Sequence, residues 1–342
     1  MDDLNNSKKW LTSFSFAAIL MSLCVCLSVF LIDPFFQFRV RDHQYFLNAA
    51  YVSAGLIKNY DYDTVIIGSC MVENYDISRF NNELDVNAVK IGCGGLGPDG
   101  VQKYTSLSNE VGKAKNYYIN VDFTSFREDG SDESILGLQD RLRIDEFDYL
   151  IQSDLLSNLK YMFCYESWFR FIPVDIGLIA YKTAGGDLSQ GKLGIRTSVA
   201  RTGEWTGNFK YGEDVVMKSR EGLNKPIPIN DKSEQEEILR NMISNMDLYV
   251  NSIDFTAGQY NFIFPPYSYL FWEDAKQANK FDIYMQAKEH MIDSLKNKGG
   301  VVYDFQDMDE TYDLNYYKDT SHYSKDLNDR MIDCMASGEY RR

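Results

Sequence analysis

One long apolar segment dominates the first forty residues. No charged side chain occurs from Trp10 to Ile32, and only scattered Ser and Thr interrupt the run. As a helix these ~23 residues would extend roughly 34 Å, enough to cross a hydrocarbon core of ~30 Å. We therefore predict a transmembrane helix over residues 10–32, preceded by a short N-terminal segment, 1–9.

The residues flanking this segment predict its orientation. Lys8 and Lys9 precede it, and Asp33 follows it. The positive-inside rule then favours a cytoplasmic N-terminus and an extracytoplasmic main domain. A cleaved signal peptide is the alternative, but the segment ends in Val-Phe-Leu-Ile and lacks the small residues of a cleavage site. We expect an uncleaved, single-pass anchor in the cell membrane.

After a connector expected over 33–60, short apolar runs alternate with amphipathic stretches. The runs that we predict as strands are TVIIGS (64–69), NAVKI (87–91), YYINVDF (117–123), YNFIF (260–264) and VVYDF (301–305). Helices are expected over 77–84, 98–110, 233–251 and 274–297, and from about 324 onward. This alternation predicts an α/β domain over 61–342, with a mostly parallel sheet covered by helices on both faces.

Residues from about 125 to 232 interrupt the alternation. A helix pair is expected over about 144–171, whereas the Gly- and Thr-rich stretch 185–212 has no assignable pattern. We interpret 125–232 as an insertion or lid within the domain.

Charge and cysteine content narrow the functional classes. The net charge of −15 argues against nucleic acid, because phosphate binding needs clustered Lys and Arg. Two of the six cysteines lie in the apolar segment, and the other four are too sparse for a disulfide framework. No C-x-x-C or H-E-x-x-H pattern occurs. We expect neither a metal nor a cofactor.

Chemically reactive side chains follow the predicted strands, where open α/β sheets form their sites. Ser69 and Cys70 follow the first strand, and Asn120 and Asp122 end the third. A glycine block, 92–97, follows the second strand and fits the dinucleotide-binding pattern G-x-G-x-x-G. That fingerprint belongs after a first strand, so a Gly-rich oxyanion loop is the preferred interpretation.

The chain has three histidines, which limits the candidates for a catalytic base. His43 lies just after the predicted span, and His290 lies in a charged amphipathic stretch. His322 lies in a polar loop after the last strand, three residues after Asp319. This spacing allows the carboxylate to orient the imidazole, so His322 is the preferred candidate.

Together these blocks resemble the SGNH (GDSL-like) hydrolase superfamily, and most closely its membrane-anchored, DltD-like bacterial members. GSCMVENY (68–75) resembles the nucleophile block, with Cys70 in the nucleophile position, and DTSHYS (319–324) resembles the closing acid–base block. The resemblance implies a flavodoxin-like three-layer α/β/α parallel sheet of the SGNH type. It also implies His322 as the base and Asp319 as its orienter.

The same resemblance implies an oxyanion hole. Its donors would be the amide of Cys70 and that of Gly94 or Gly95, together with Asn120. This sequence departs from the family pattern in two places: Cys70 replaces the usual serine, and the third block has Asn-Val-Asp in place of G-x-N-D.

Cys70 therefore has several interpretations. It is a thiol nucleophile activated by His322, or Ser69 attacks in its place, or the site is inactive. A further alternative is that Cys70 is a small buried residue at a strand end with a packing role only. A disulfide between Cys70 and Cys93 would block or regulate the site.

The activity implied by the resemblance is that of an esterase or O-acyltransferase. Its substrate would be the acyl groups of a cell-envelope glycan or teichoic-type polymer, and its partner a membrane-bound O-acyltransferase. The alternative is a catalytically inactive accessory or glycan-binding protein that assists such an acyltransferase.

Overall fold

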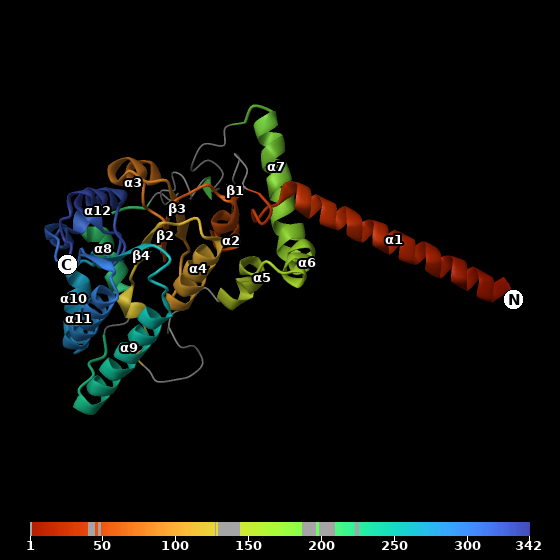
Figure 1. The fold of residues 1–342 in the computed structure, drawn as a ribbon. Coiled ribbons are helices and arrows are strands. Elements are labelled where there is room, and N and C mark those ends of the chain that lie inside the picture. The colour runs from red at the N-terminus through yellow and green to blue at the C-terminus, as the bar shows by residue number, and fades with distance from the viewer. Residues whose placement is uncertain are drawn as a thin grey trace.

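A computed structural model shows an α/β domain with one long helix projecting from it (Figure 1). The structure describes residues 2–39, 45–46, 49–126, 128, 144–186, 196–197, 209–222 and 226–342. The predicted α/β class, the parallel sheet and the N-terminal apolar helix are confirmed.

Five parallel strands form the central sheet in the order β3-β2-β4-β6-β7. Their bounds are β2 (Thr64–Gly68), β3 (Ala88–Gly92), β4 (Asn116–Asn120), β6 (Gln259–Phe264) and β7 (Val301–Asp304). Every residue of β2 and β3 is buried, as expected for strands covered on both faces. Gly68 pairs with Gly92, so these two strands end at the same level.

Helices cover both faces of this sheet (Figure 1). One face packs against α2 (Ala49–Asn59), α4 (Pro98–Val111), α9 (Lys232–Ser252) and α11 (Phe281–Asn297). The other packs against α3 (Ile77–Leu84), α12 (Lys325–Ser337) and part of α8 (Glu213–Glu221) and α10 (Tyr269–Gln277). Successive residues of a strand face opposite sides, so Val65 and Ile67 enter the first core and Ile66 enters the second.

Several elements differ from their predicted bounds. The expected connector 33–60 contains α2, which is buried along eight of its eleven residues and belongs to the first core. The single helix expected over 274–297 is two helices, α10 and α11, which contact each other. A two-stranded antiparallel sheet pairs β1 (Tyr45–Phe46) with β5 (Arg196–Thr197).

The expected helix pair over 144–171 is a longer series of helices. It comprises α5 (Asp148–Ile151), α6 (Leu155–Phe163), a π-helical turn (Glu166–Phe171) and α7 (Ile172–Thr183). Short 3₁₀ turns lie at Phe123–Ser125, Ile144–Phe147, Asp309–Tyr312 and Leu314–Tyr316. Most of the unassigned stretch 185–212, and 129–143 of the insertion, lie outside the described residues.

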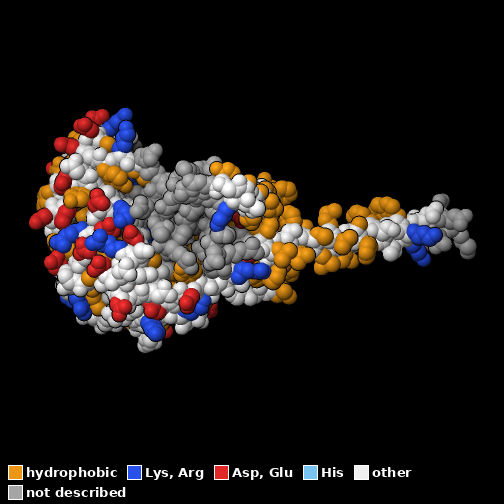
Figure 2. Space-filling model, turned by 90° about the horizontal axis from the view of Figure 1, so that it is seen from above, with side chains coloured by type: hydrophobic (Ala, Val, Ile, Leu, Met, Phe, Trp, Pro, Cys, Tyr) orange, Lys and Arg blue, Asp and Glu red, His pale blue; other side chains and the backbone are white. Residues whose placement is uncertain are grey.

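The N-terminal helix α1 (Asp2–Ile32) projects away from the domain (Figure 1). Its 27-residue stretch Asn6–Ile32 is long and apolar enough to cross a membrane. Nearly all its side chains are exposed within the protein, as Figure 2 shows along the projecting helix.

A packed junction joins α1 to the domain. The buried carboxylate of Asp33 accepts hydrogen bonds from the amides of Gln37 (2.9 Å) and Phe38 (2.8 Å), and from the Tyr161 hydroxyl (2.8 Å). The fully buried ring of Phe35 lies against the rings of Tyr51, Tyr161 and Phe171. Together these contacts connect the end of α1 to α2, α6 and the π-helical turn.

Candidate active site

Cys70, His322 and Asp319 form a hydrogen-bonded series at the carboxyl end of the sheet. Cys70 lies in the loop after β2, and the other two lie in the loop before α12. The Cys70 Sγ is 3.0 Å from His322 Nε2. On the other side of the ring, His322 Nδ1 is 2.9 Å from Asp319 Oδ2. A nucleophile, a base and an orienting carboxylate are thus within hydrogen-bond reach of one another.

Electrostatics favour a charged histidine in this series. Burial alone lowers the pKa of His322, but the contacts with Asp319 and Cys70 outweigh it and raise that pKa to about 9. Burial also raises the pKa of Asp319, but hydrogen bonds from the His322 ring and amide and from the Ser321 amide outweigh it. The pKa of Asp319 therefore lies well below its ordinary value of 3.8. At neutral pH an imidazolium thus lies beside the thiol, where it can stabilise a thiolate.

Buried polar contacts hold the Cys70 loop in place. Lys90, a fully buried residue of β3, donates from Nζ to the carbonyls of Glu73 (2.8 Å) and Tyr75 (2.7 Å). Asn74 Nδ2 donates to the carbonyl of Tyr323 (3.4 Å), which links this loop to the loop of the histidine. Lys90 was not predicted as part of the site, although a lysine inside a run predicted as a buried strand is a signal for such a role.

The loop that carries the histidine is fixed in the same way. The His322 amide donates to Asp319 Oδ1 (2.7 Å), which closes a tight turn. Ser268, which is fully buried, donates from both its amide and its hydroxyl to the carbonyl of Thr320 (3.1 and 2.7 Å). The histidine loop is therefore held by the segment after β6, the Cys70 loop is held by β3, and Asn74 links the two loops.

The predicted oxyanion donors differ in their availability. The Gly94 amide donates to Glu73 Oε1 (3.0 Å) and is engaged in holding the loop. Gly95 lines the cavity beside Cys70 and has a positive φ of 81°. Among the residues that the structure describes, the amides of Cys70 and Gly95 have no hydrogen-bond acceptor. Of the two glycines, Gly95 is thus the better placed.

Asn120 is a buried amide without a partner. Its side chain is 3% exposed, and neither Oδ1 nor Nδ2 has a hydrogen bond within the described part of the chain. Leaving such a group unpaired costs about 1–3 kcal/mol, so an unpaired amide at the end of a strand points to a missing ligand. Gly68 permits this position, because a Cβ there would lie 2.7 Å from Asn120 Cβ and 2.5 Å from Val72 Cγ2.

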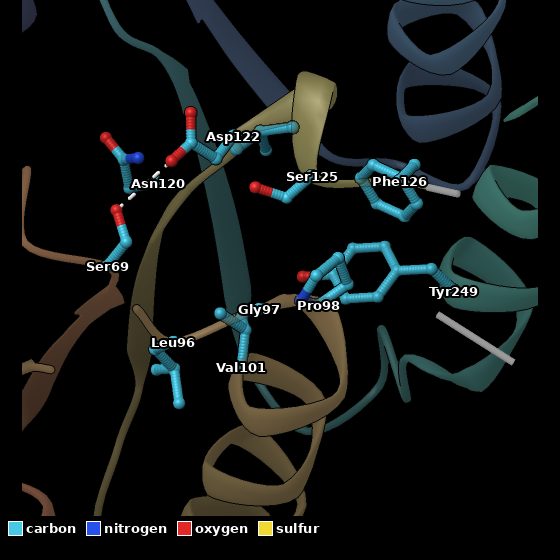
Figure 3. A pocket seen from close by; sticks show the side chains of 11 residues that line it. Ser69, Leu96, Gly97, Pro98, Val101, Asn120, Asp122, Ser125, Phe126 and Tyr249 are labelled. Atoms are coloured by element: carbon cyan, nitrogen blue, oxygen red, sulfur yellow. Dashed lines mark hydrogen bonds between the residues drawn. The ribbon is translucent and has the colours of Figure 1, made fainter. Parts of the chain in front are cut away.

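Ser69 and Asp122 form a second hydrogen-bonded group beside the series. Ser69 Oγ donates to Asp122 Oδ2 (3.2 Å), as the dashed line in Figure 3 marks, and the Tyr267 hydroxyl donates to Asp122 Oδ1. Ser69 therefore points to Asp122, and it is Cys70 that meets the histidine. Tyr267, which follows β6, is a member of this group that our sequence analysis did not single out.

Two cavities adjoin these groups. The larger, of about 270 Å³, is lined by Cys70, His322, Gly95 and Phe271 among others. The smaller, of about 20 Å³, has a polar end at Ser69, Asn120 and Asp122 and an apolar end formed by Val101, Phe126 and Tyr249 (Figure 3). Ser69 and Asp122 line both.

The remaining candidates lie apart from this site. His290 bonds Asp247 (2.7 Å) between α11 and α9, and His43 lies outside the described residues. All six cysteines are free, and Cys93 is buried against Ser53 Oγ (3.2 Å), so the structure does not pair it with Cys70. Burial raises the pKa of the Cys93 thiol to about 12. In the described ranges, no group of three or more His, Cys, Asp or Glu residues could hold a metal.

The comparisons with known proteins identify no relative. No protein-family model, no curated protein and no solved structure matches this chain. The assignment of a function therefore depends on the geometry of the site.

Proposed function

We propose that this chain is an SGNH-type ester hydrolase or O-acyltransferase that uses a cysteine as its nucleophile. The observation that carries the proposal is the series from Cys70 Sγ to His322 Nε2 (3.0 Å) and from His322 Nδ1 to Asp319 Oδ2 (2.9 Å). The strand order supports it, because β3-β2-β4-β6-β7 is the order 2-1-3-4-5 of flavodoxin-like sheets. Cys70 lies just after β2 and Asn120 is the last residue of β4, and these are the neighbouring strands at which that order changes direction.

In the proposed reaction the Cys70 thiolate attacks the carbonyl carbon of an ester. The Cys70 and Gly95 amides and the Asn120 side chain would bind the oxyanion of the tetrahedral intermediate. The ester C–O bond then breaks, His322 gives its proton to the departing alkoxide, and a thioester remains on Cys70. His322, now neutral, takes a proton from water or from an acceptor hydroxyl, which attacks the thioester and releases the thiolate.

The setting proposed for this reaction is the outer side of a cell membrane. α1 would be an uncleaved single span with Lys8 and Lys9 on the cytoplasmic side, which places the α/β domain outside. The substrate would be an acylated cell-envelope glycan or teichoic-type polymer. A membrane-bound O-acyltransferase would be the partner that supplies or receives the acyl group.

Hydrolysis of p-nitrophenyl acetate by the full chain in detergent, under reducing conditions, tests the catalytic proposal. We expect activity in the wild type, its loss in Cys70→Ala and His322→Ala, and an acetyl thioester on Cys70 by mass spectrometry. Cys164→Ala is the matched control, because Cys164 is a partly exposed free thiol away from the site.

Two results would contradict the catalytic proposal. Unchanged activity in Cys70→Ala would remove the thiol from the mechanism. No activity in the wild type, with activity in Cys70→Ser, would indicate a natural pseudoenzyme and the accessory role.

A further inference from the structure

An exposed apolar face runs along α6, the π-helical turn and α7. Nine large apolar side chains on these elements are at least 39% exposed, and Leu156 (76%), Leu155 (73%) and Phe169 (72%) are the most exposed. Isolated exposed side chains of this kind are common, but a contiguous set marks a contact surface. The members of this apolar face are Leu155, Leu156, Leu159, Phe163, Tyr165, Phe169, Ile176, Ile179 and Tyr181.

This face is distinct from the side of the same helices that packs on the domain. Tyr161, Phe171 and Leu178 are buried and supply the inward contacts. A surface helix ordinarily pairs such an inward stripe with a polar outer side. Here the outer side is apolar as well, so the domain core does not account for it.

The position of the apolar face relative to α1 indicates what covers it. α1 packs against α6 and α7, and Figure 1 shows these two helices running crosswise to α1 at the point where it enters the domain. The junction at Asp33 and Phe35 fixes that arrangement through buried contacts with Tyr161 and Phe171. In Figure 2, hydrophobic side chains gather where the domain meets α1.

The net charge of this segment also indicates which kind of surface covers the apolar face. Residues 154–183 contain three basic side chains (Lys160, Arg170, Lys182) and three acidic ones (Asp154, Glu166, Asp175), so their net charge is zero. An anionic lipid surface therefore gains little from this segment, and apolar burial is the available driving force.

We propose that α6, the π-helical turn and α7 lie in the surface of the bilayer and form a second membrane contact beside α1. A helix that spans a bilayer leaves it at the headgroup level, which is where the crosswise helices of this junction lie. The proposal rests on insertion of α1 in a membrane and is independent of the catalytic proposal.

Quenching of tryptophan emission by brominated lipid tests this proposal. The full chain is reconstituted in vesicles of phosphatidylcholine, with and without bromine in the upper acyl chain. Phe169→Trp places the probe on the apolar face. Tyr312→Trp is the matched control, because Tyr312 is equally exposed (73%) but stacks on Tyr269 at α10, on the far side of the domain from α1 (Figure 1).

We expect the emission added by Phe169→Trp to be lost in brominated vesicles and that added by Tyr312→Trp to be retained. Comparison with Trp10→Phe reports separately whether α1 is inserted. Equal emission of Phe169→Trp in both kinds of vesicle, with Trp10 quenched, would overturn the proposal and indicate a protein partner or water on this face.

Phe169 stacks on Tyr165 (5.1 Å between ring centroids), so its replacement could disturb that pair. Leu156→Trp on α6 places a probe on the same apolar face without changing the Tyr165–Phe169 pair. Retained emission from both variants would count against membrane contact, whereas quenching of both would support it. Because no catalytic residue is changed, the result is separable from any loss of ester hydrolysis.

Discussion

Replacing Asp319 with Asn should lower the pKa of His322 sharply. In the wild type that pKa is about 9, against an ordinary value of 6.5, although burial acts in the opposite direction. Asparagine keeps the size of the side chain but removes the charge that stabilises the imidazolium. We expect the pKa to fall to 6.5 or below. The difference between 9 and 6.5, at about 1.36 kcal/mol per pKa unit, corresponds to about 3 kcal/mol.

The same difference sets a dependence of stability on pH. Because the folded-state pKa of His322 lies above 6.5, its contribution to stability is fully present below pH 6.5. That contribution is lost as pH rises through about 9. Wild type and Asp319→Asn should therefore differ most in free energy of unfolding below pH 6.5, down to the acid range in which Asp319 itself becomes protonated. The two should converge as pH rises into the alkaline range.

Proton NMR of the imidazole Cε1–H signals is a suitable assay, because the chain has only three histidines. The titration is followed on the full chain in detergent micelles. Asp247→Asn is the control, since Asp247 bonds His290 (2.7 Å) and should leave the His322 curve unchanged. A pKa of His322 still near 9 in Asp319→Asn would refute the conclusion that the Asp319 carboxylate raises the pKa of His322.

Three further outcomes are expected. The kcat/KM for ester hydrolysis should fall as pH rises through about 9, because neutral His322 has no proton for the leaving alcohol; a pH–rate profile checks this. Gly68→Ala should displace Asn120 and lower kcat for ester hydrolysis at least about tenfold, measured by steady-state kinetics. The added methyl should also lower the free energy of unfolding by about 1–3 kcal/mol through overpacking, measured by denaturant unfolding. Phe35→Ala should cost about 3–5 kcal/mol in unfolding free energy, against under ~0.5 for exposed Phe169→Ala, measured by denaturation in detergent.

The strands and most helices could be predicted from the sequence because their periodicity is strong. β-branched and aromatic runs placed all five strands of the central sheet within a few residues of their bounds. α2 was the main omission. Its sequence, AAYVSAGLIKN, is apolar on nearly all sides because the helix lies between α4 and β3, and such a segment has no amphipathic signal.

The candidate site could be predicted in part, because parallel strands bring their carboxyl ends to one edge. That rule placed Cys70, Asn120 and His322 near one another. It could not indicate which glycine amide already has a hydrogen-bond acceptor, because the Gly94 amide donates to the side chain of Glu73 in another loop. The roles of Lys90 and Tyr267 were missed for the same reason, since both act through contacts between distant parts of the chain.

Because the junction at Asp33 and Phe35 is buried, no flexible linker separates α1 from the α/β domain. A flexible linker of twenty residues would spread over ~25 Å and let a domain sweep the space above its anchor. Here α1 ends at Ile32 and the chain is buried from Asp33 to Phe36, so α1 and the domain turn as one body. With α1 in a bilayer, the Cys70 cavity would remain at one height above the lipid. Under the proposed function, a long polymer would then be modified only where it passes through that thin layer, and lateral diffusion would be the means of search.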